Sequence, residues 1–166
     1  MTIRGPYTRI GALFAALAFI IDQGFKMAMI YVVDMPHVRR INIAPFFDIV
    51  LAWNRGVSYG LFTQHTQAGR WLLVAVAMTV VAGLWLWLAR LRRMLPAVGV
   101  GLIIGGALAN ALDRVIFGAV ADFFWFHAGR FSWYVFNLAD VAIVAGVALI
   151  LYDSFLDGDD ARPSGA

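Results

Sequence analysis

The chain alternates between long apolar stretches and shorter polar ones, and four of the apolar stretches are long enough to cross a membrane. They cover residues 10–33, 71–89, 96–117 and 134–155. The hydrocarbon core of a bilayer is roughly 30 Å thick, which requires about 20 mostly apolar residues in a helix. The pattern therefore predicts four transmembrane helices in a single integral membrane domain covering residues 1–166.

Composition supports this interpretation and excludes several kinds of chemistry. The chain is 62% hydrophobic and 14% charged, and its mean hydropathy is +0.79. The interior of a soluble domain of this size could not hold so much apolar surface. There is no cysteine, which excludes thiolate catalysis and iron–sulfur clusters. His37, His65 and His127 are scattered without metal-ligand spacing, so we expect neither a metal nor another cofactor.

The basic residues predict the orientation of the chain in the membrane. Arg90, Arg92 and Arg93 crowd the short connection between the second and third apolar stretches, and Arg4 and Arg9 precede the first. By the positive-inside rule this side is cytoplasmic, with both termini and a tail over residues 156–166. Because the basic residues flank the predicted spans, they indicate a membrane rather than a nucleic-acid partner.

The segment over residues 34–70 would then lie on the periplasmic side. Its β-branched and aromatic residues on both sides of Asn54-Arg55-Gly56 predict a short hairpin or a small sheet at the membrane surface. The eight aromatic residues between positions 123 and 136 predict an interfacial belt. The expected fold is an all-α integral membrane protein: a four-helix bundle with a small β-rich periplasmic segment.

Costly polar residues interrupt three of the four apolar stretches at a similar depth. At ~1.5 Å per residue, Asp22 and Asp140 lie about 18 Å from the cytoplasmic ends of their helices, and Asn110 lies about 22 Å from its own. An ionisable group at such a depth indicates function by default. Asp140 has no basic residue on its own predicted helix, so the layer is expected to contain the functional site.

Spacing along the predicted helices indicates which polar residues share a face. Asp22 and Lys26 stand at i and i+4, so we expect a structural ion pair, and we expect another between Asp113 and Arg114. Asn54 is equally explained as a turn residue or as a site residue. A series of small residues spaced four apart predicts a close helix–helix contact; it comprises Gly101, Gly105 and Ala109.

Carboxylates are the catalytic groups that remain. Two aspartates in one site cannot both ionise readily, so one proton is held between them while the ionised partner activates water. Asp122 and Asp140 are the natural candidates, with Asp22 and Asp113 as alternates. Intramembrane carboxylates also mark the paths of transporters and proton relays, and a non-catalytic adaptor for lipidated chains is a second alternative.

Five short motifs follow one another along the chain: DQGFK (22–26), NRGVSYG (54–60), GGALANALDR (105–114), VADF (120–123) and FNLAD (136–140). In residues and in order they resemble the motifs of the lipoprotein signal peptidases, the type II signal peptidases of bacteria. Tyr59 stands where phenylalanine is usual, and Ala109 where glycine is usual. Together the motifs cover most of the chain.

The resemblance implies a membrane aspartic endopeptidase that removes signal peptides from diacylglyceryl-modified prolipoproteins. Cleavage would fall just before the lipidated cysteine, through an Asp122–Asp140 dyad and water. The chain would be a monomer in the bacterial inner membrane, with lipid-modified prolipoproteins and membrane lipids as its partners and with its active site toward the periplasm. The residues carried over as substrate-binding are Asn54, Asn110, Arg114 and Asn137, and those carried over as supporting are Asp22, Lys26 and Asp113.

Overall fold

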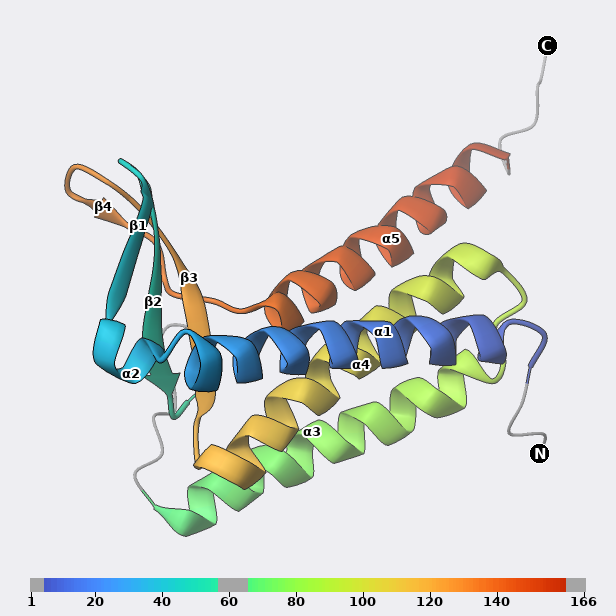
Figure 1. Ribbon diagram of the computed structural model, residues 1–166. Coiled ribbons are helices and arrows are strands. Elements are labelled where there is room, and N and C mark those ends of the chain that lie inside the picture. Colours follow the sequence, from blue (N-terminus) through green and yellow to red (C-terminus); the bar gives the residue numbers. More distant parts are fainter. Residues whose placement is uncertain (1–4, 57–65, 161–166) are drawn as a thin grey trace.

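The computed structural model describes residues 5–56 and 66–160, with the backbone alone at 157–160. Four long helices lie side by side, and a small sheet stands across one end of them (Figure 1). The helical elements are α1 (Thr8–Met27), continued by the π-helical turn η1 (Ala28–Val32), α2 (Met35–Val38), α3 (Gln67–Leu88), α4 (Met94–Phe117) and α5 (Leu138–Asp160). The strands are β1 (Arg40–Ala44), β2 (Phe47–Asn54), β3 (Val120–Ala128) and β4 (Phe131–Ser132).

The four helices predicted from hydropathy are present, and each is long and apolar enough to cross a membrane. Three of them match the expected ranges within a few residues. The fourth begins at Leu138 rather than at Tyr134 and continues to Asp160, into the expected tail. The prediction that Asp140 lies deep inside this helix is therefore wrong, because Asp140 occupies the first turn.

Helix α4 is the centre of the bundle, and glycines allow its neighbours to approach closely. A side chain at Gly101 or Gly105 would meet the backbone carbonyl of Gly11 or Ala15 on α1. On another face of α4, a side chain at Gly106 would meet the carbonyl of Ala139 on α5. The small-residue series predicted from the sequence is thus the contact with α1. Helix α3 packs mainly against α4, and at its C-terminal end Leu88 also packs against α1; α3 is the most exposed of the four long helices.

The sheet is antiparallel throughout, in the order β1-β2-β3-β4. Strands β3 and β4 follow α4, so the β structure is not confined to residues 34–70 as expected. The aromatic segment predicted as an interfacial belt supplies β3, which pairs with β2. The turn of the observed hairpin lies between β1 and β2, before Asn54, and Asn54 itself ends β2 opposite Val120.

The sheet also determines where α5 begins. Phe136 forms an isolated antiparallel bridge with Phe124 of β3, through hydrogen bonds in both directions. A residue paired to a strand cannot at the same time contribute its backbone to a helix, so α5 starts just after the bridge. Asp122 lies two positions before Phe124 on β3. The bridge therefore places the residues that follow Phe136 beside Asp122.

The glycine contacts give a direct test of the packing. We expect Gly101→Val to lower the free energy of unfolding by about 1–3 kcal/mol, because the new side chain collides with the backbone of α1. Gly83→Val on α3 is the matched control, since a side chain there meets nothing within 4 Å. Thermal unfolding of both variants in detergent measures the difference. Equal melting temperatures would contradict the packing described here.

Candidate active site

A fully buried lysine, Lys26, lies at the bottom of the polar layer, beneath the cavity. The Lys26 Nζ lies 2.8 Å from Asp22 Oδ2 and 2.7 Å from Asp113 Oδ2, and the three side chains have no exposed surface. The Asp22–Lys26 pair predicted from the sequence is confirmed. The predicted pairing of Asp113 with Arg114 is wrong, because the carboxylate of Asp113 faces α1 and takes Lys26 as its partner.

Asp122 lies near the start of β3 and is almost fully buried. Its Oδ1 accepts a hydrogen bond of 2.6 Å from Asn137 Nδ2, and the side chain of Asn54 forms a second one. Burial raises the pKa of Asp122 to about 7, and the neighbouring charge of Asp140 acts in the same direction. Asp122 can therefore hold a proton near neutral pH.

Asp140 lies at the N-terminus of α5, in a reciprocal cap with Asn137. The backbone N–H of Asp140 donates to Asn137 Oδ1 over 2.9 Å, while Asp140 Oδ2 accepts from the backbone N–H of Asn137 over 3.3 Å. This is the geometry of a capping box. Because the positive end of the helix dipole favours an anion there, the first turn stabilises an ionised carboxylate.

Two asparagine amides connect the two aspartates. Asn137 Nδ2 donates to Asp122 and, over 3.1 Å, to Asn110 Oδ1. Asn110 Nδ2 in turn donates to Asp140 Oδ1 over 3.0 Å. The chain Asp122–Asn137–Asn110–Asp140 joins β3, α4 and α5. The polar layer expected from the depths of these residues is thus one hydrogen-bonded network.

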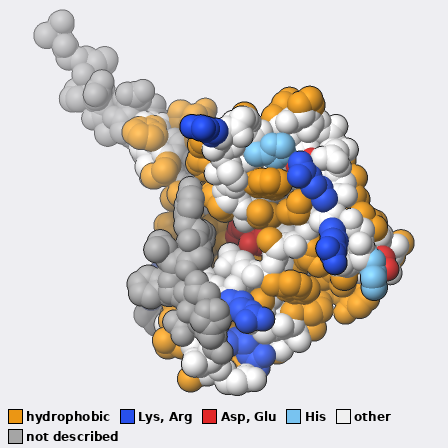
Figure 2. Space-filling view, turned by 90° about the vertical axis from the view of Figure 1, so that its left-hand side faces the viewer, with side chains coloured by type: hydrophobic (Ala, Val, Ile, Leu, Met, Phe, Trp, Pro, Cys, Tyr) orange, Lys and Arg blue, Asp and Glu red, His pale blue; other side chains and the backbone are white. Residues whose placement is uncertain are grey.

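Both aspartates line a cavity of about 280 Å³, together with Asn54, Asn110 and Arg114. Figure 2, which views the molecule from the end that carries the sheet, shows acidic side-chain atoms inside a recess. Arg114 donates to the Gly56 carbonyl over 2.8 Å and to the Asn110 carbonyl over 3.0 Å. Among the residues that the structure describes, its buried Nε–H has no hydrogen-bond partner.

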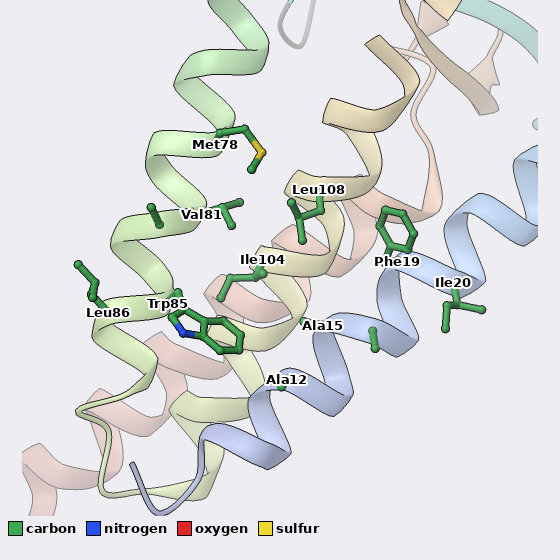
Figure 3. Close-up of a pocket in the computed structure, with 12 residues that line it drawn as sticks. Ala12, Ala15, Phe19, Ile20, Met78, Val81, Trp85, Leu86, Ile104 and Leu108 are labelled. Carbon is green, nitrogen blue, oxygen red and sulfur yellow. The ribbon is translucent and has the colours of Figure 1, made fainter. Parts of the chain in front are cut away.

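A larger hollow lies elsewhere and has no chemistry of this kind. It measures about 900 Å³ and lies between α1, α3 and α4, lined by apolar side chains such as Phe19, Met78 and Trp85 (Figure 3). No residue with a carboxylate, a hydroxyl or a carboxamide is among those lining it. The smaller cavity is therefore the candidate active site.

The predicted site residues divide by position. Asn54, Asn110 and Arg114 line the cavity with the two aspartates, whereas Asn137 is fully buried and orients them. Asp22, Lys26 and Asp113 lie beneath, outside the lining. Tyr59 and His65 lie outside the described residues, while the other two histidines pair with acidic side chains, His37 with Asp34 and His127 with Asp48.

Sequence reasoning assigned no role to Gln23. Its Nε2 donates to Asp113 Oδ1 over 2.7 Å and to the Ala109 carbonyl over 3.3 Å, which connects α1 to α4. The signal was present in the first motif, where Gln23 stands between the two charged residues of the i, i+4 pair. A third, longer contact of 3.4 Å joins the same nitrogen to Asp22 Oδ2, and a buried carboxamide with these partners is a structural group in this position.

Four membrane-length helices and a buried pair of linked carboxylates at one end define a polytopic membrane protein with a polar cavity at that end. The model of the family described as signal peptidase (SPase) II matches residues 14–156. The chain belongs to the signal peptidase II family, and it is a bacterial membrane protease.

Curated relatives agree with this assignment, and a solved structure shares the fold. A "Lipoprotein signal peptidase" of Methylobacterium sp. (strain 4-46) is 49% identical over 160 residues, which cover 94% of this chain and 97% of the relative. One of Methylorubrum extorquens (strain PA1) is 53% identical over 143 residues, covering 86% and 82%. A solved structure titled as a bacterial membrane enzyme shares the fold with a TM-score of 0.82 at 21% identity, covering 100% of this chain and 99% of that one.

The raised pKa of Asp122 predicts a pH-dependent stability. The folded protein keeps a proton on Asp122 up to about pH 7, whereas the unfolded chain releases it near pH 3.8. The contribution of Asp122 to the free energy of unfolding is therefore complete at low pH and is lost as the pH rises toward 7. Asp122→Asn cannot titrate, so we expect the melting temperature of wild type to fall relative to this variant between pH 5 and pH 8. Because the loss is complete at about pH 7, the part that falls above pH 5 corresponds to ~3 kcal/mol at about 1.36 kcal/mol per pH unit. Parallel melting curves would contradict the assignment.

Proposed function

We propose that this chain is an aspartic endopeptidase that removes signal peptides from diacylglyceryl-modified prolipoproteins. Cleavage falls just before the lipidated cysteine and uses Asp122, Asp140 and one water molecule. The family supplies the kind of reaction, and the curated relatives are named for lipoprotein substrates. The finer assignment depends on the site itself.

The observation that carries the proposal is the placement of two linked carboxylates on one cavity. Asp122 and Asp140 come from different elements, β3 and α5, and both line the same space of about 280 Å³. The bridging amides hold them in fixed positions relative to one another. An aspartyl dyad requires this arrangement, because a single water must lie within reach of both side chains.

The environments of the two aspartates assign them different roles. Asp140 accepts hydrogen bonds from Asn110 Nδ2 and from the backbone N–H of Asn137, at the positive end of a helix. Asp122 is on a strand, without the field of a helix end, and its pKa is raised to about 7 by burial. We therefore assign the charge to Asp140 and the shared proton to Asp122.

This assignment leads to a balanced reaction. The ionised Asp140 removes a proton from the water as its oxygen attacks the scissile carbonyl carbon, while the neutral Asp122 hydrogen-bonds the carbonyl oxygen. Asp140 then delivers the proton to the nitrogen of the leaving cysteine residue as the carbon–nitrogen bond breaks. The Nε–H of Arg114, which has no partner among the described residues, is available to bind a backbone carbonyl of the substrate.

The location of the site suits a lipid-anchored substrate. The cavity lies between the sheet and the adjacent ends of the helices, whereas the rest of their length is apolar. In our proposal this end faces the periplasm and both termini face the cytoplasm. A cysteine whose lipid chains lie in the outer leaflet then presents its peptide bond at the depth of the dyad.

A transport function is less well supported by the same geometry. A path for ions or protons requires polar groups at successive depths through the membrane. On the described helices, the fully buried charges of Asp22, Lys26 and Asp113 instead gather near the sheet, and Asp153 lies at the opposite end; the hollow between α1, α3 and α4 is apolar. The proposed hydrolysis requires the two aspartates to be held in fixed relative positions, as the cap and the bridging amides hold them. A proton relay does not require this arrangement.

The first experiment is cleavage of a diacylglyceryl-modified prolipoprotein by the purified protein in lipid or detergent. Asp122→Asn and Asp140→Asn should each lower kcat by at least about 10³-fold, because the acid or the base of the reaction is lost. Thermal unfolding serves as the control that both variants remain folded. Cleavage by either folded variant at a rate near wild type would refute the dyad.

Chelation of metal ions gives an independent prediction. Because the proposed chemistry needs only carboxylates and water, a strong divalent-metal chelator should leave kcat and KM unchanged. The same preparation, substrate and detergent are used with and without the chelator. A loss of activity that added zinc or magnesium restores would exclude the proposed mechanism.

A further inference from the structure

The ammonium of Lys26 binds the residues that hold the two active-site aspartates in place. Its three N–H donors have three oxygen acceptors: Asp22 Oδ2 at 2.8 Å, Asp113 Oδ2 at 2.7 Å and Asn110 Oδ1 at 3.3 Å. A lysine has no more than three donors, so its hydrogen-bonding capacity is fully used. Lys26 itself does not line the cavity.

One of its carboxylate partners fixes the start of α5. The second oxygen of Asp22, Oδ1, accepts a hydrogen bond of 2.8 Å from the backbone N–H of Ala139. Ala139 immediately precedes Asp140, and the first N–H groups of a helix have no partner within the helix. Asp22 thus caps α5 from a different helix and determines the position of Asp140, the general base of the proposed dyad.

The other carboxylate partner fixes the start of β3 in the same way. Asp113 Oδ2 accepts a hydrogen bond of 3.1 Å from the backbone N–H of Ala121. Ala121 immediately precedes Asp122, the acid of the dyad. The two halves of the site are therefore equivalent: a carboxylate bound to Lys26 holds the backbone one residue before each active-site aspartate.

The third partner of Lys26 orients a side chain that touches the dyad. Asn110 Oδ1 accepts from Lys26 Nζ and from Asn137 Nδ2, both of which are donors only. The oxygen of this amide must therefore point toward them, and its Nδ2 must point toward Asp140. Lys26 thereby determines which way the Asn110 amide faces.

From these contacts we infer that Lys26 is the positioning residue of the dyad, a single buried cation that sets the separation and orientation of Asp122 and Asp140 without touching the substrate. The inference rests on the proposed peptidase function, since it concerns the same two carboxylates. It assigns to the supporting lysine an effect on kcat rather than on substrate binding.

The charge of Lys26 also acts on the dyad and provides a second readout. The charged groups around Asp122 are Asp140 on α5, Asp113 and Arg114 on α4, and Lys26 on α1. The cation of Lys26 opposes the rise in the pKa of Asp122. Removing this cation must raise the pKa of Asp122 further and move the pH dependence of cleavage to higher pH.

The test compares wild type with Lys26→Met and with the double variant Lys26→Met/Asp22→Asn, using the lipidated prolipoprotein substrate. Lys26→Met should lower kcat about 100-fold, the effect of a displacement of roughly 1 Å, with little change in KM. Its pH profile should move to higher pH. The double variant removes one negative charge together with the positive one and keeps an oxygen acceptor for Ala139, so its profile should return toward wild type while kcat remains low.

If Lys26→Met does not fold, the double variant is used for the test. It is less destabilised because only one buried carboxylate, Asp113, lacks a cation, whereas Lys26→Met leaves two. Arg93→Met is the matched control: it removes an ion pair of 3.1 Å to Asp153 at the opposite end of the helices. It should change the melting temperature without changing the pH profile. The inference is overturned if a folded Lys26 variant has the kcat and pH profile of wild type. Absence of cleavage by wild type would instead reject the proposed function.

Discussion

The structure depends on one buried ion-pair cluster, in which a single ammonium binds two carboxylates from different helices. Taking these groups out of water costs several kcal/mol for each ion, and the cost is met only when each has close, well-aligned partners. Lys26, Asp22 and Asp113 satisfy this condition with contacts of 2.7 and 2.8 Å. Because both carboxylates also accept backbone N–H groups, the cluster joins α1 and α4 to the starts of α5 and β3.

The two aspartates of the proposed dyad lie where regular elements begin. Asp140 is in the first turn of α5, and Asp122 is near the start of β3. Such positions leave unpaired backbone donors that a neighbouring side chain can bind, so they can be fixed by contacts from other elements. They also create the difference between the two aspartates. The end of a helix stabilises a charge, while a buried strand favours the protonated form.

The apolar part of the molecule serves a different purpose. Helix α4 is packed on two faces through glycines, and α3 leaves most of its surface for lipid. Dispersion and close backbone contact hold such helices together where water is absent. The two linked carboxylates lie at the end that carries the sheet, so that in the proposed function a substrate anchored by its lipid chains would reach them without leaving the membrane.

The sequence by itself determined the four helices, the presence of a close helix contact along the glycines of α4, the Asp22–Lys26 pair and the set of residues that share one polar layer. These follow from hydropathy and helical periodicity, which act over a few residues. The tertiary structure alone decided that α5 starts at Leu138, that Asp113 binds Lys26 rather than its neighbour Arg114, and that Asn137 orients both aspartates instead of lining the cavity. Each of these outcomes depends on a hydrogen bond or ion pair between distant positions, such as Ala139 with Asp22, 117 residues apart. No local sequence pattern specifies such a partner, because the partner depends on which element packs beside the residue in the folded chain.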